Sequence, residues 1–281
     1  MRHGAVLPFV TEREFVDLAR VAEDAGWDAV FTWEAVWAQD AWATLAAAAV
    51  VTERIRLGTI VTPVPRYRPW DLASRVGSVD RLSRGRVTLG AGLGAVHGNW
   101  LAFEPDEGRG VRAARLDEAL EIYRGLFAGQ PYAFEGRHWS ARPVDELLPP
   151  PPVQRPHPPV WCVGALVPGR DRQRSLERAA RWEGVLPAVV GGEGHSALTL
   201  EALREVVERV GAARSAAGLS MDGYDVVVEG DSHGGFGDVH GPSEPWAQAG
   251  ATWWVESWWD LPDSPEGRAE TRRRLELGPQ R

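Results

Sequence analysis

One stretch, residues 52–94, constrains the fold more than any other part of the chain because it reads as strand, helix, strand and glycine-rich turn. The apolar run at 55–61 is followed by two prolines, which cannot donate ladder hydrogen bonds. Apolar residues at helical spacing over 69–82 predict a helix, and 87–89 starts a second strand. The exit at 90–94 has glycine at alternate positions, so backbone can approach a ligand closely there. This β-α-β unit predicts a parallel sheet with its ligand site at the carboxyl ends of the strands.

The remainder of the chain repeats the same alternation of strand and helix. Further strands are expected at 4–9, 27–33, 160–163, 184–189, 224–228 and 252–255, and further helices at 12–25, 40–52, 116–127, 172–182, 200–210, 243–249 and from 266. Eight such units in 281 residues predict an α/β fold, a closed (β/α)8 TIM barrel in one domain over 1–281. An open, doubly wound sheet is the alternative.

Two longer connections interrupt this alternation. Residues 95–110 are polar and glycine-rich, and we expect no regular structure in them. Residues 129–159 form an insertion between the fourth and fifth strands, with a small hairpin at 134–139 and a run of prolines at 149–152.

Composition excludes several classes of protein. The net charge of -8 argues against a nucleic-acid surface, although all 31 basic residues are arginine. The single cysteine, Cys162, excludes an internal disulfide and a thiolate zinc cage, and we predict no metal site. Because no apolar run reaches the roughly 18 residues of a membrane helix and the first residues lack a signal pattern, we expect a cytoplasmic protein that does not enter a membrane.

Two side chains are candidates for acid–base chemistry. Glu34 follows the second strand, where barrel enzymes place catalytic groups, although a solvated or salt-bridged glutamate fits the pattern equally well. His97 lies in the 95–110 connection beside Asn99, and a histidine in a loop is more often simply solvated.

Several short segments, in order along nearly the whole chain, resemble the bacterial-luciferase-like flavin-dependent oxidoreductases. They are Gly26-Trp-Asp-Ala-Val30, Thr52-Glu-Arg-Ile-Arg-Leu-Gly-Thr59, Asp80-Arg-Leu-Ser83, Leu89-Gly-Ala-Gly-Leu-Gly94, Val153-Gln-Arg-Pro156, Arg178-Ala-Ala-Arg-Trp182 and Ala249-Gly-Ala-Thr-Trp-Trp254 with Glu256. No single segment is decisive, but the set is specific.

The resemblance implies a barrel that binds reduced FMN or the deazaflavin coenzyme F420 at its carboxyl-terminal mouth. It implies a non-proline cis peptide between Ile60 and Val61 that supports the flavin ring. The segment 164–170 would approach the phosphate, with Arg170 as an anion clamp and Arg112 as a weaker candidate. The cofactor-binding residues implied in this way are Ile60, Val61, Thr62, Gly92, Leu93, Gly94, Gly164, Ala165 and Arg170.

The chain departs from the family pattern at one important position. Many relatives end the second strand in Asp-His or Glu-His, whereas this chain has Glu34-Ala35. Since alanine exchanges no proton, another group such as Glu34 or His97 acts, or the chemistry needs no acid there, or the protein binds flavin without turnover. We expect a substrate pocket lined by Trp33, Trp37, Asn99 and Glu256, although packing explains the tryptophans equally well.

These observations favour a monooxygenase that uses reduced FMN and oxygen on a small organic substrate. FMN is preferred because no cationic tract for the polyglutamate tail of F420 is evident in the sequence. Hydride transfer with F420 and a non-catalytic flavin-binding accessory protein are the alternatives, and a hydrolase or lyase using Glu34 and Glu256 would bind no flavin. The expected partners are the substrate, a flavin reductase and a second copy of the chain, for which the helix at 40–52 offers an interface.

Overall fold

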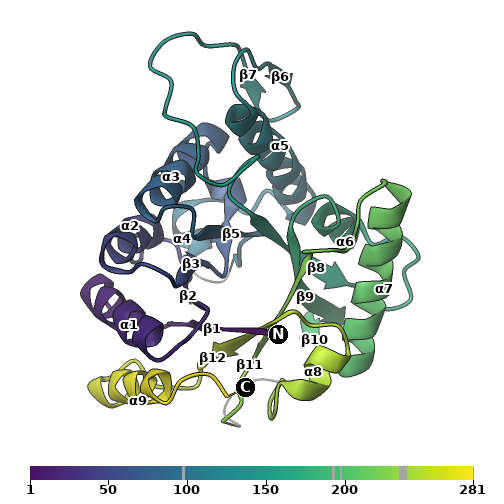
Figure 1. Ribbon diagram of the computed structural model, residues 1–281. Helices are drawn as coiled ribbons and strands as arrows, with labels where there is room; N and C mark the ends of the chain where they lie inside the picture. The colour runs from purple at the N-terminus through teal and green to yellow at the C-terminus, as the bar shows by residue number, and fades with distance from the viewer. Residues whose placement is uncertain (97–98, 192–193, 197, 234–238, 281) are drawn as a thin grey trace.

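Eight parallel strands close into a barrel in the computed structural model, which describes residues 1–96, 99–191, 194–196, 198–233 and 239–280. Each strand pairs with the next in chain order, and the last pairs with the first, so the predicted (β/α)8 barrel is confirmed. In Figure 1 the strands surround the centre and the helices form an outer ring. The barrel strands are β1 (Arg2–Val6), β2 (Ala29–Thr32), β3 (Arg56–Thr59), β5 (Val87–Gly92), β8 (Val160–Leu166), β9 (Gly184–Gly191), β11 (Asp225–Gly230) and β12 (Trp253–Ser257).

The outer helices begin and end at recognisable local signals. A capping box between Thr11 and Glu14 starts the first of them, and Pro69 starts the third, which covers the predicted residues 69–82. The helices that follow barrel strands are α1 (Glu12–Asp24), α2 (Ala41–Val51), α3 (Pro69–Leu82), α5 (Arg109–Ala128), α6 (Arg174–Ala179), α7 (Leu200–Ala216), α8 (Glu244–Gln248) and α9 (Pro265–Glu276).

The connection at 95–110 differs from expectation because it contains helix. A short helix, α4 (Trp100–Phe103), follows Asn99, and α5 already begins at Arg109 instead of near 116. Trp100 is only 5% exposed, so burial of this one indole folds a segment whose composition is polar. Predicted residue His97 lies outside the described residues.

Smaller elements extend the barrel strands or lie in the connections between them. The third strand continues as β4 (Thr62–Pro63), which pairs with β5 and leads into a 3-10 turn, η1 (Val64–Arg66). A short strand, β10 (Gly194–Ser196), pairs antiparallel with β9. The insertion carries the predicted hairpin, formed by β6 (Phe134–Glu135) and β7 (Ser140–Ala141), and extends beyond the barrel at the top of Figure 1.

Apolar side chains form two cores, one on each face of the barrel sheet. The larger core lies between the strands and the helices, as expected for a parallel sheet covered by helices. The smaller core fills the barrel interior with side chains from alternate positions of the strands: Val6, Ala29, Phe31, Ile60, Trp161, Leu186, Val227, Trp253 and Val255.

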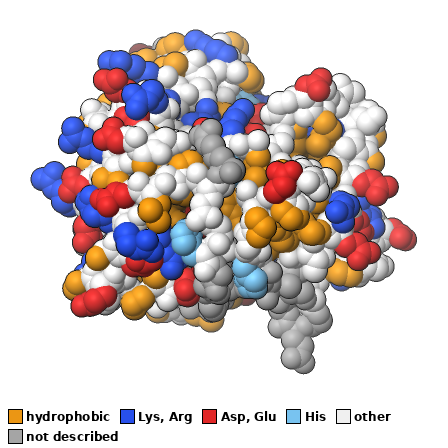
Figure 2. Space-filling model, turned by 60° about the horizontal axis from the view of Figure 1, so that its bottom comes forward, with side chains coloured by type: hydrophobic (Ala, Val, Ile, Leu, Met, Phe, Trp, Pro, Cys, Tyr) orange, Lys and Arg blue, Asp and Glu red, His pale blue; other side chains and the backbone are white. Residues whose placement is uncertain are grey.

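The surface mixes charged and apolar side chains. On the face in Figure 2, arginines and acidic residues are interspersed with hydrophobic side chains, so charges of both signs share that face. Among the described helices, none combines the length and the apolar character needed to span a bilayer.

Candidate active site

An open mouth lies above the interior core, at the carboxyl ends of the barrel strands. Strand side chains alternate between the two faces, so the residue two positions after an interior residue also faces the interior, one layer higher. In this upper layer Trp33, Val163, Glu229 and Trp259 are only partly buried, whereas the layer below them is buried. Val61 directly follows the interior residue Ile60, and it also packs against the interior core and is partly buried. The solvent therefore reaches the barrel interior at this level.

One wall of the mouth is built by the end of β3, by β4 and by the glycine-rich end of β5. The peptide bond between Ile60 and Val61 is cis, as the resemblance implied. Thr62 is fully buried, and its hydroxyl lies 2.9 Å from that of Thr59, which fixes the turn between the two strand segments. An added Cβ at Gly92 would lie 2.9 Å from Val61 Cγ2, so the absence of a side chain there keeps this wall open.

The remainder of the glycine-rich turn is held by aromatic packing. Gly94 has φ +79°, and an added Cβ would lie 2.4 Å from the ring of Trp100 and 2.8 Å from Pro63 Cβ. Gly94 is therefore required both by its backbone conformation and by its neighbours. Leu93 packs partly against the outer core and also lines a groove between α5 and α6.

Glu34 lies just after β2, beside the turn that follows β4. The Tyr67 hydroxyl donates a 2.9 Å hydrogen bond to Glu34 Oε1, while Oε2 is buried and has no hydrogen-bond partner among the described residues. Burial raises the pKa of Glu34 to about 7, against the opposing effects of the Tyr67 hydrogen bond and the charge of Arg66. Burial and the neighbouring carboxyl raise the pKa of Tyr67. This pair can hold a proton near neutral pH.

A second carboxyl group, Glu229, lies on the opposite wall. Strands that are four positions apart lie on opposite sides of an eight-stranded barrel. β11 is therefore opposite β3, and β12 is opposite β5. The Ser257 hydroxyl donates to Glu229 Oε2 at 3.0 Å. Burial raises the pKa of Glu229, whereas hydrogen bonds from Ser257 and Trp259 act in the opposite direction. Glu229 thus faces the cis peptide across the barrel.

An arginine-rich groove of about 1280 Å³ lies between α5, α6 and the segment after β8. Its lining includes six arginines, Arg109, Arg170, Arg172, Arg174, Arg178 and Arg181, but only three acidic residues, Asp117, Asp171 and Glu177. Arg178 forms an ion pair with Asp117 at 2.7 Å, whereas Arg170 is exposed. We call this feature the arginine groove.

The predicted phosphate-side residues Gly164 and Ala165 lie at the end of β8 beside this groove. An added Cβ at Gly164 would lie 2.5 Å from Val185 and 2.8 Å from Leu176, so the glycine allows α6 to pack closely. The Ser175 hydroxyl bonds both backbone groups of Ala165, at 3.1 Å to N and 2.7 Å to O. These two residues therefore position the groove through packing and backbone contacts.

Other predicted residues lie at the rim of the mouth. Trp37 is 83% exposed and packs edge-to-face on Phe103, with ring centroids 6.0 Å apart. Asn99 is exposed with φ 61° at the start of α4. Arg112 forms an ion pair with Asp106, and its guanidinium lies 5.8 Å from the ring centroid of Trp100.

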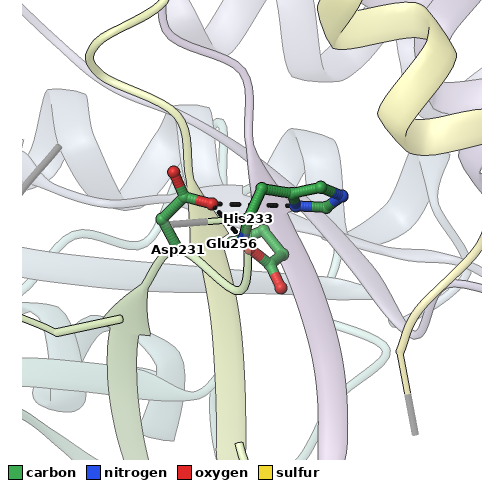
Figure 3. A group of neighbouring side chains, drawn as sticks. All are labelled: Asp231, His233 and Glu256. Atoms are coloured by element: carbon green, nitrogen blue, oxygen red, sulfur yellow. Dashed lines mark hydrogen bonds and ion pairs between the residues drawn. The ribbon is translucent and has the colours of Figure 1, made fainter. Parts of the chain in front are cut away.

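Glu256 lies in a different environment from the one expected for a pocket residue. Figure 3 shows it with Asp231 and His233, and their potential ligand atoms lie within 4.8 Å of one another. Its carboxylate accepts hydrogen bonds from Trp254 Nε1 at 2.8 Å and from the backbone of Ser232 at 3.0 Å. Because Trp254 belongs to the outer core, Glu256 points away from the interior that Val255 faces.

The structure therefore brings together Trp33, Val61, Thr62 and Gly92 at the mouth, and it separates Glu256 from them. Tyr67, Ser257 and Trp259 are not among the residues predicted from the sequence, and Glu229 is only the residue that follows the strand predicted at 224–228. The alternation along β11 and β12 is the signal for Glu229, Ser257 and Trp259, since they continue the pattern of Val227 and Val255.

Known proteins share both the sequence pattern and the fold. The sequence profile of the luciferase-like monooxygenase family matches residues 3–233. An F420-dependent glucose-6-phosphate dehydrogenase of Beutenbergia cavernae is 32% identical over 218 residues, which are 70% of this chain and 63% of that enzyme. The chain thus spans less than two thirds of that relative's length.

Two further relatives are named for oxygenation. The oxygenase component of a flavin-dependent trigonelline monooxygenase from Acinetobacter baylyi is 28% identical over 153 residues, 53% of this chain and 42% of that protein. The crystal structure of the monooxygenase RslO1 from Streptomyces bottropensis superimposes with a TM-score of 0.68 at 27% identity, covering 82% of this chain and 71% of that one. Since the family profile covers most of the chain, this protein belongs to the luciferase-like monooxygenase family.

Proposed function

We propose that this protein is an oxidoreductase that binds reduced FMN or coenzyme F420 at the barrel mouth and acts there on a small organic molecule. The observation that carries the proposal is the wall in which the cis peptide at Ile60, the buried Thr62 and the bare backbone of Gly92 meet. Relatives named for F420-dependent dehydrogenation and for flavin-dependent monooxygenation support it.

The residues of this wall fit a planar tricyclic ring. A Cβ at Gly92 would fill the space next to Val61, so glycine leaves a flat surface against which a ring can lie. Val61 and Val163 are apolar and partly exposed, which suits one face of an aromatic ring. The cofactor supplies the redox chemistry, either oxygen activation by reduced FMN or hydride transfer by F420.

The protein's own groups would bind and orient the cofactor, and they would exchange protons at the site. The Glu34–Tyr67 pair, close to the alanine that replaces the common histidine, would hold a proton next to the cofactor wall. Arg170 and its neighbours in the arginine groove would bind the anionic end of the cofactor through charge-assisted hydrogen bonds.

The arginine groove favours F420 as the cofactor. The sequence had shown no cationic tract, but in the folded chain six arginines from α5, α6 and the segments on either side of α6 line one groove. Three of them, Arg172, Arg178 and Arg181, form ion pairs with carboxylates of the groove, and the other three add positive charge to it. The polyglutamate tail of F420 carries several carboxylates, and such a tail matches an extended positive surface better than a single phosphate does. With FMN the protein would instead need a reductase partner, a requirement suggested by the "oxygenase component" among its relatives.

Anaerobic titration tests this proposal directly. The purified protein would be titrated with reduced FMN and, separately, with reduced F420, and binding would be followed by calorimetry. We expect saturable binding of at least one cofactor, and we expect F420 to bind more tightly than FMN. Binding of neither would contradict the proposed function, and binding of one without turnover over a broad substrate panel would support the non-catalytic alternative.

A further inference from the structure

We propose that the substrate of this site is an apolar molecule with one hydroxyl or carbonyl group, held with that oxygen against Glu229 and with its apolar body against Trp33 and Trp259. The inference rests on the proposed oxidoreductase function and adds a substrate class and an anchoring residue to it.

The side of the mouth formed by the ends of β2 and β12 is aromatic, and its rings are fixed. Trp33 donates its indole N–H to the Pro8 carbonyl at 2.7 Å, so the polar atom of this side chain is already used. Trp33 and Trp259 pack edge-to-face with centroids 5.4 Å apart, and Phe9 packs on Trp259 at 6.1 Å. Because both tryptophans are partly exposed, hydrocarbon surface remains for a ligand to cover.

Glu229 lies beside these aromatic rings, and Trp259 donates a hydrogen bond to it. Glu229 continues the interior-facing pattern of Val227, and the Ser257 hydroxyl fixes its Oε2. A carboxylate accepts a hydrogen bond from an alcohol, and a carboxylic acid donates one to a carbonyl. Burial raises the pKa of Glu229, so its protonated form persists to a higher pH than that of an exposed glutamate. The single oxygen of an alcohol or a ketone substrate can therefore form a hydrogen bond with Glu229.

The same wall disfavours a phosphorylated sugar, the substrate named for one relative. A sugar phosphate presents several hydroxyls and a dianion, whereas the indole N–H groups of Trp33 and Trp259 already donate to the Pro8 carbonyl and to Glu229. Polar groups buried without partners cost free energy, and an ionised Glu229 would repel the phosphate.

Probe binding can test this substrate class on the wild-type protein. With its tighter cofactor bound, the protein would be titrated calorimetrically with 2-tetralol, 2-tetralone, tetralin and glucose 6-phosphate. We expect the alcohol and the ketone to bind about tenfold or more tightly than tetralin, since each gains one hydrogen bond to Glu229, and more tightly than glucose 6-phosphate. Equal affinity for tetralin, or tighter binding of the sugar phosphate, would overturn the proposal.

Variants locate the effect at Glu229. Glu229→Leu should remove the preference for the oxygenated probes over tetralin, and Glu229→Gln, which keeps a donor and an acceptor, should retain most of it. Glu135→Leu on the exposed hairpin is the matched control and should change nothing. Cofactor affinity, measured on each variant, reports whether the mouth is intact. Failure of wild-type cofactor binding would contradict the proposed function, whereas an unchanged preference in a cofactor-binding Glu229→Leu variant would contradict only the role of Glu229.

Discussion

At the scale of single residues, two glycines on the inner face of β5 have different roles. An added Cβ at Gly90 would lie 2.0 Å from the carbonyl oxygen of Thr59, which is backbone and cannot rotate away. At Gly92 the nearest atom is a side-chain methyl of Val61 at 2.9 Å, which can shift. Gly90 is thus required for the barrel, whereas Gly92 keeps the mouth open.

Alanine substitutions at Gly90 and at Gly92 should distinguish an effect on the stability of the fold from an effect on cofactor binding. We expect Gly90→Ala to lower the free energy of unfolding by about 3 kcal/mol through overpacking, and Gly92→Ala to lower it by about 1 kcal/mol. Gly92→Ala should still weaken cofactor binding about tenfold, because its methyl group occupies the ring surface. Urea denaturation and calorimetric titration measure the two effects. Wild-type cofactor affinity in Gly92→Ala would exclude that surface as the ring site.

Glu34 should make stability depend on pH in an unusual direction. Its folded pKa of about 7 lies above the ordinary glutamate pKa of 4.5, so the folded state binds the proton more tightly than the unfolded chain. This contribution is complete below pH 4.5 and is lost as pH rises to about 7, by up to about 3 kcal/mol. Urea unfolding at several pH values should show this loss in the wild type but not in Glu34→Gln. Parallel pH curves for the two proteins would contradict the raised pKa.

At the scale of elements, Arg86 joins the end of α2 to the end of α3. Its guanidinium donates to the carbonyl oxygens of Ala49 at 2.9 Å and Ile55 at 2.6 Å, and to that of Ser83 at 2.7 Å. It also donates to the carbonyl oxygen of Thr52 at 2.8 Å. The bonds to Ala49, Thr52 and Ser83 satisfy carbonyls that the helix ends leave without partners, and the bond to Ile55 holds the residue before β3.

Replacement of Arg86 by lysine should therefore be costly although the charge is kept. A lysine cannot present the planar fork of donors, and the carbonyls left unpaired should lower the free energy of unfolding by about 3 kcal/mol. Arg84→Lys is the control, because Arg84 is exposed two positions away. Urea denaturation compares both variants with the wild type. Similar small losses in the two would show that the Arg86 bonds contribute little net stability.

The elements that sequence predicts best are those with local start and stop signals. The helix at 69–82 has Pro69 at its start and Ser83-Arg84-Gly85 after it, and the structure places it at those residues. Strand ends depend instead on neighbours: β8 extends to Leu166 because six of its residues pair with β9. The helix at 100–103 was missed because burial of Trp100, a tertiary contact, stabilises it.

At the scale of the whole molecule, the mouth combines residues that are far apart in sequence. Closure of the barrel brings Glu229 opposite Ile60, and it brings Trp259 against Trp33. The strand count predicts such a closure, but the register that decides which side chain faces inward comes from pairing with neighbouring strands. For this reason the cis peptide and the glycine-rich turn, which are local to residues 59–94, could be predicted together with Trp33 at a strand end, whereas the position of Glu229 and Trp259 relative to them could not.

The arginine groove likewise exists only in the folded chain, and it makes salt dependence a property of the whole molecule. The net charge of -8 repels an anionic cofactor at long range, while the arginines of the groove attract it locally. Exposed charges are screened within about 8 Å at physiological ionic strength. We therefore expect the affinity for F420 to fall about tenfold between low and high salt, and the affinity for FMN to fall less.

Arg170→Gln should weaken F420 binding at low salt about tenfold and flatten its salt dependence, because one charge that faces the tail is removed. Arg272→Gln is the control, because it removes one positive charge from an exposed position on α9, away from the groove. It should have little effect on F420 binding. Calorimetric titrations over a range of salt concentrations compare the two variants. Equal effects of both would mean that the overall charge governs cofactor affinity, and an F420 affinity independent of salt would mean that the tail does not bind in the groove.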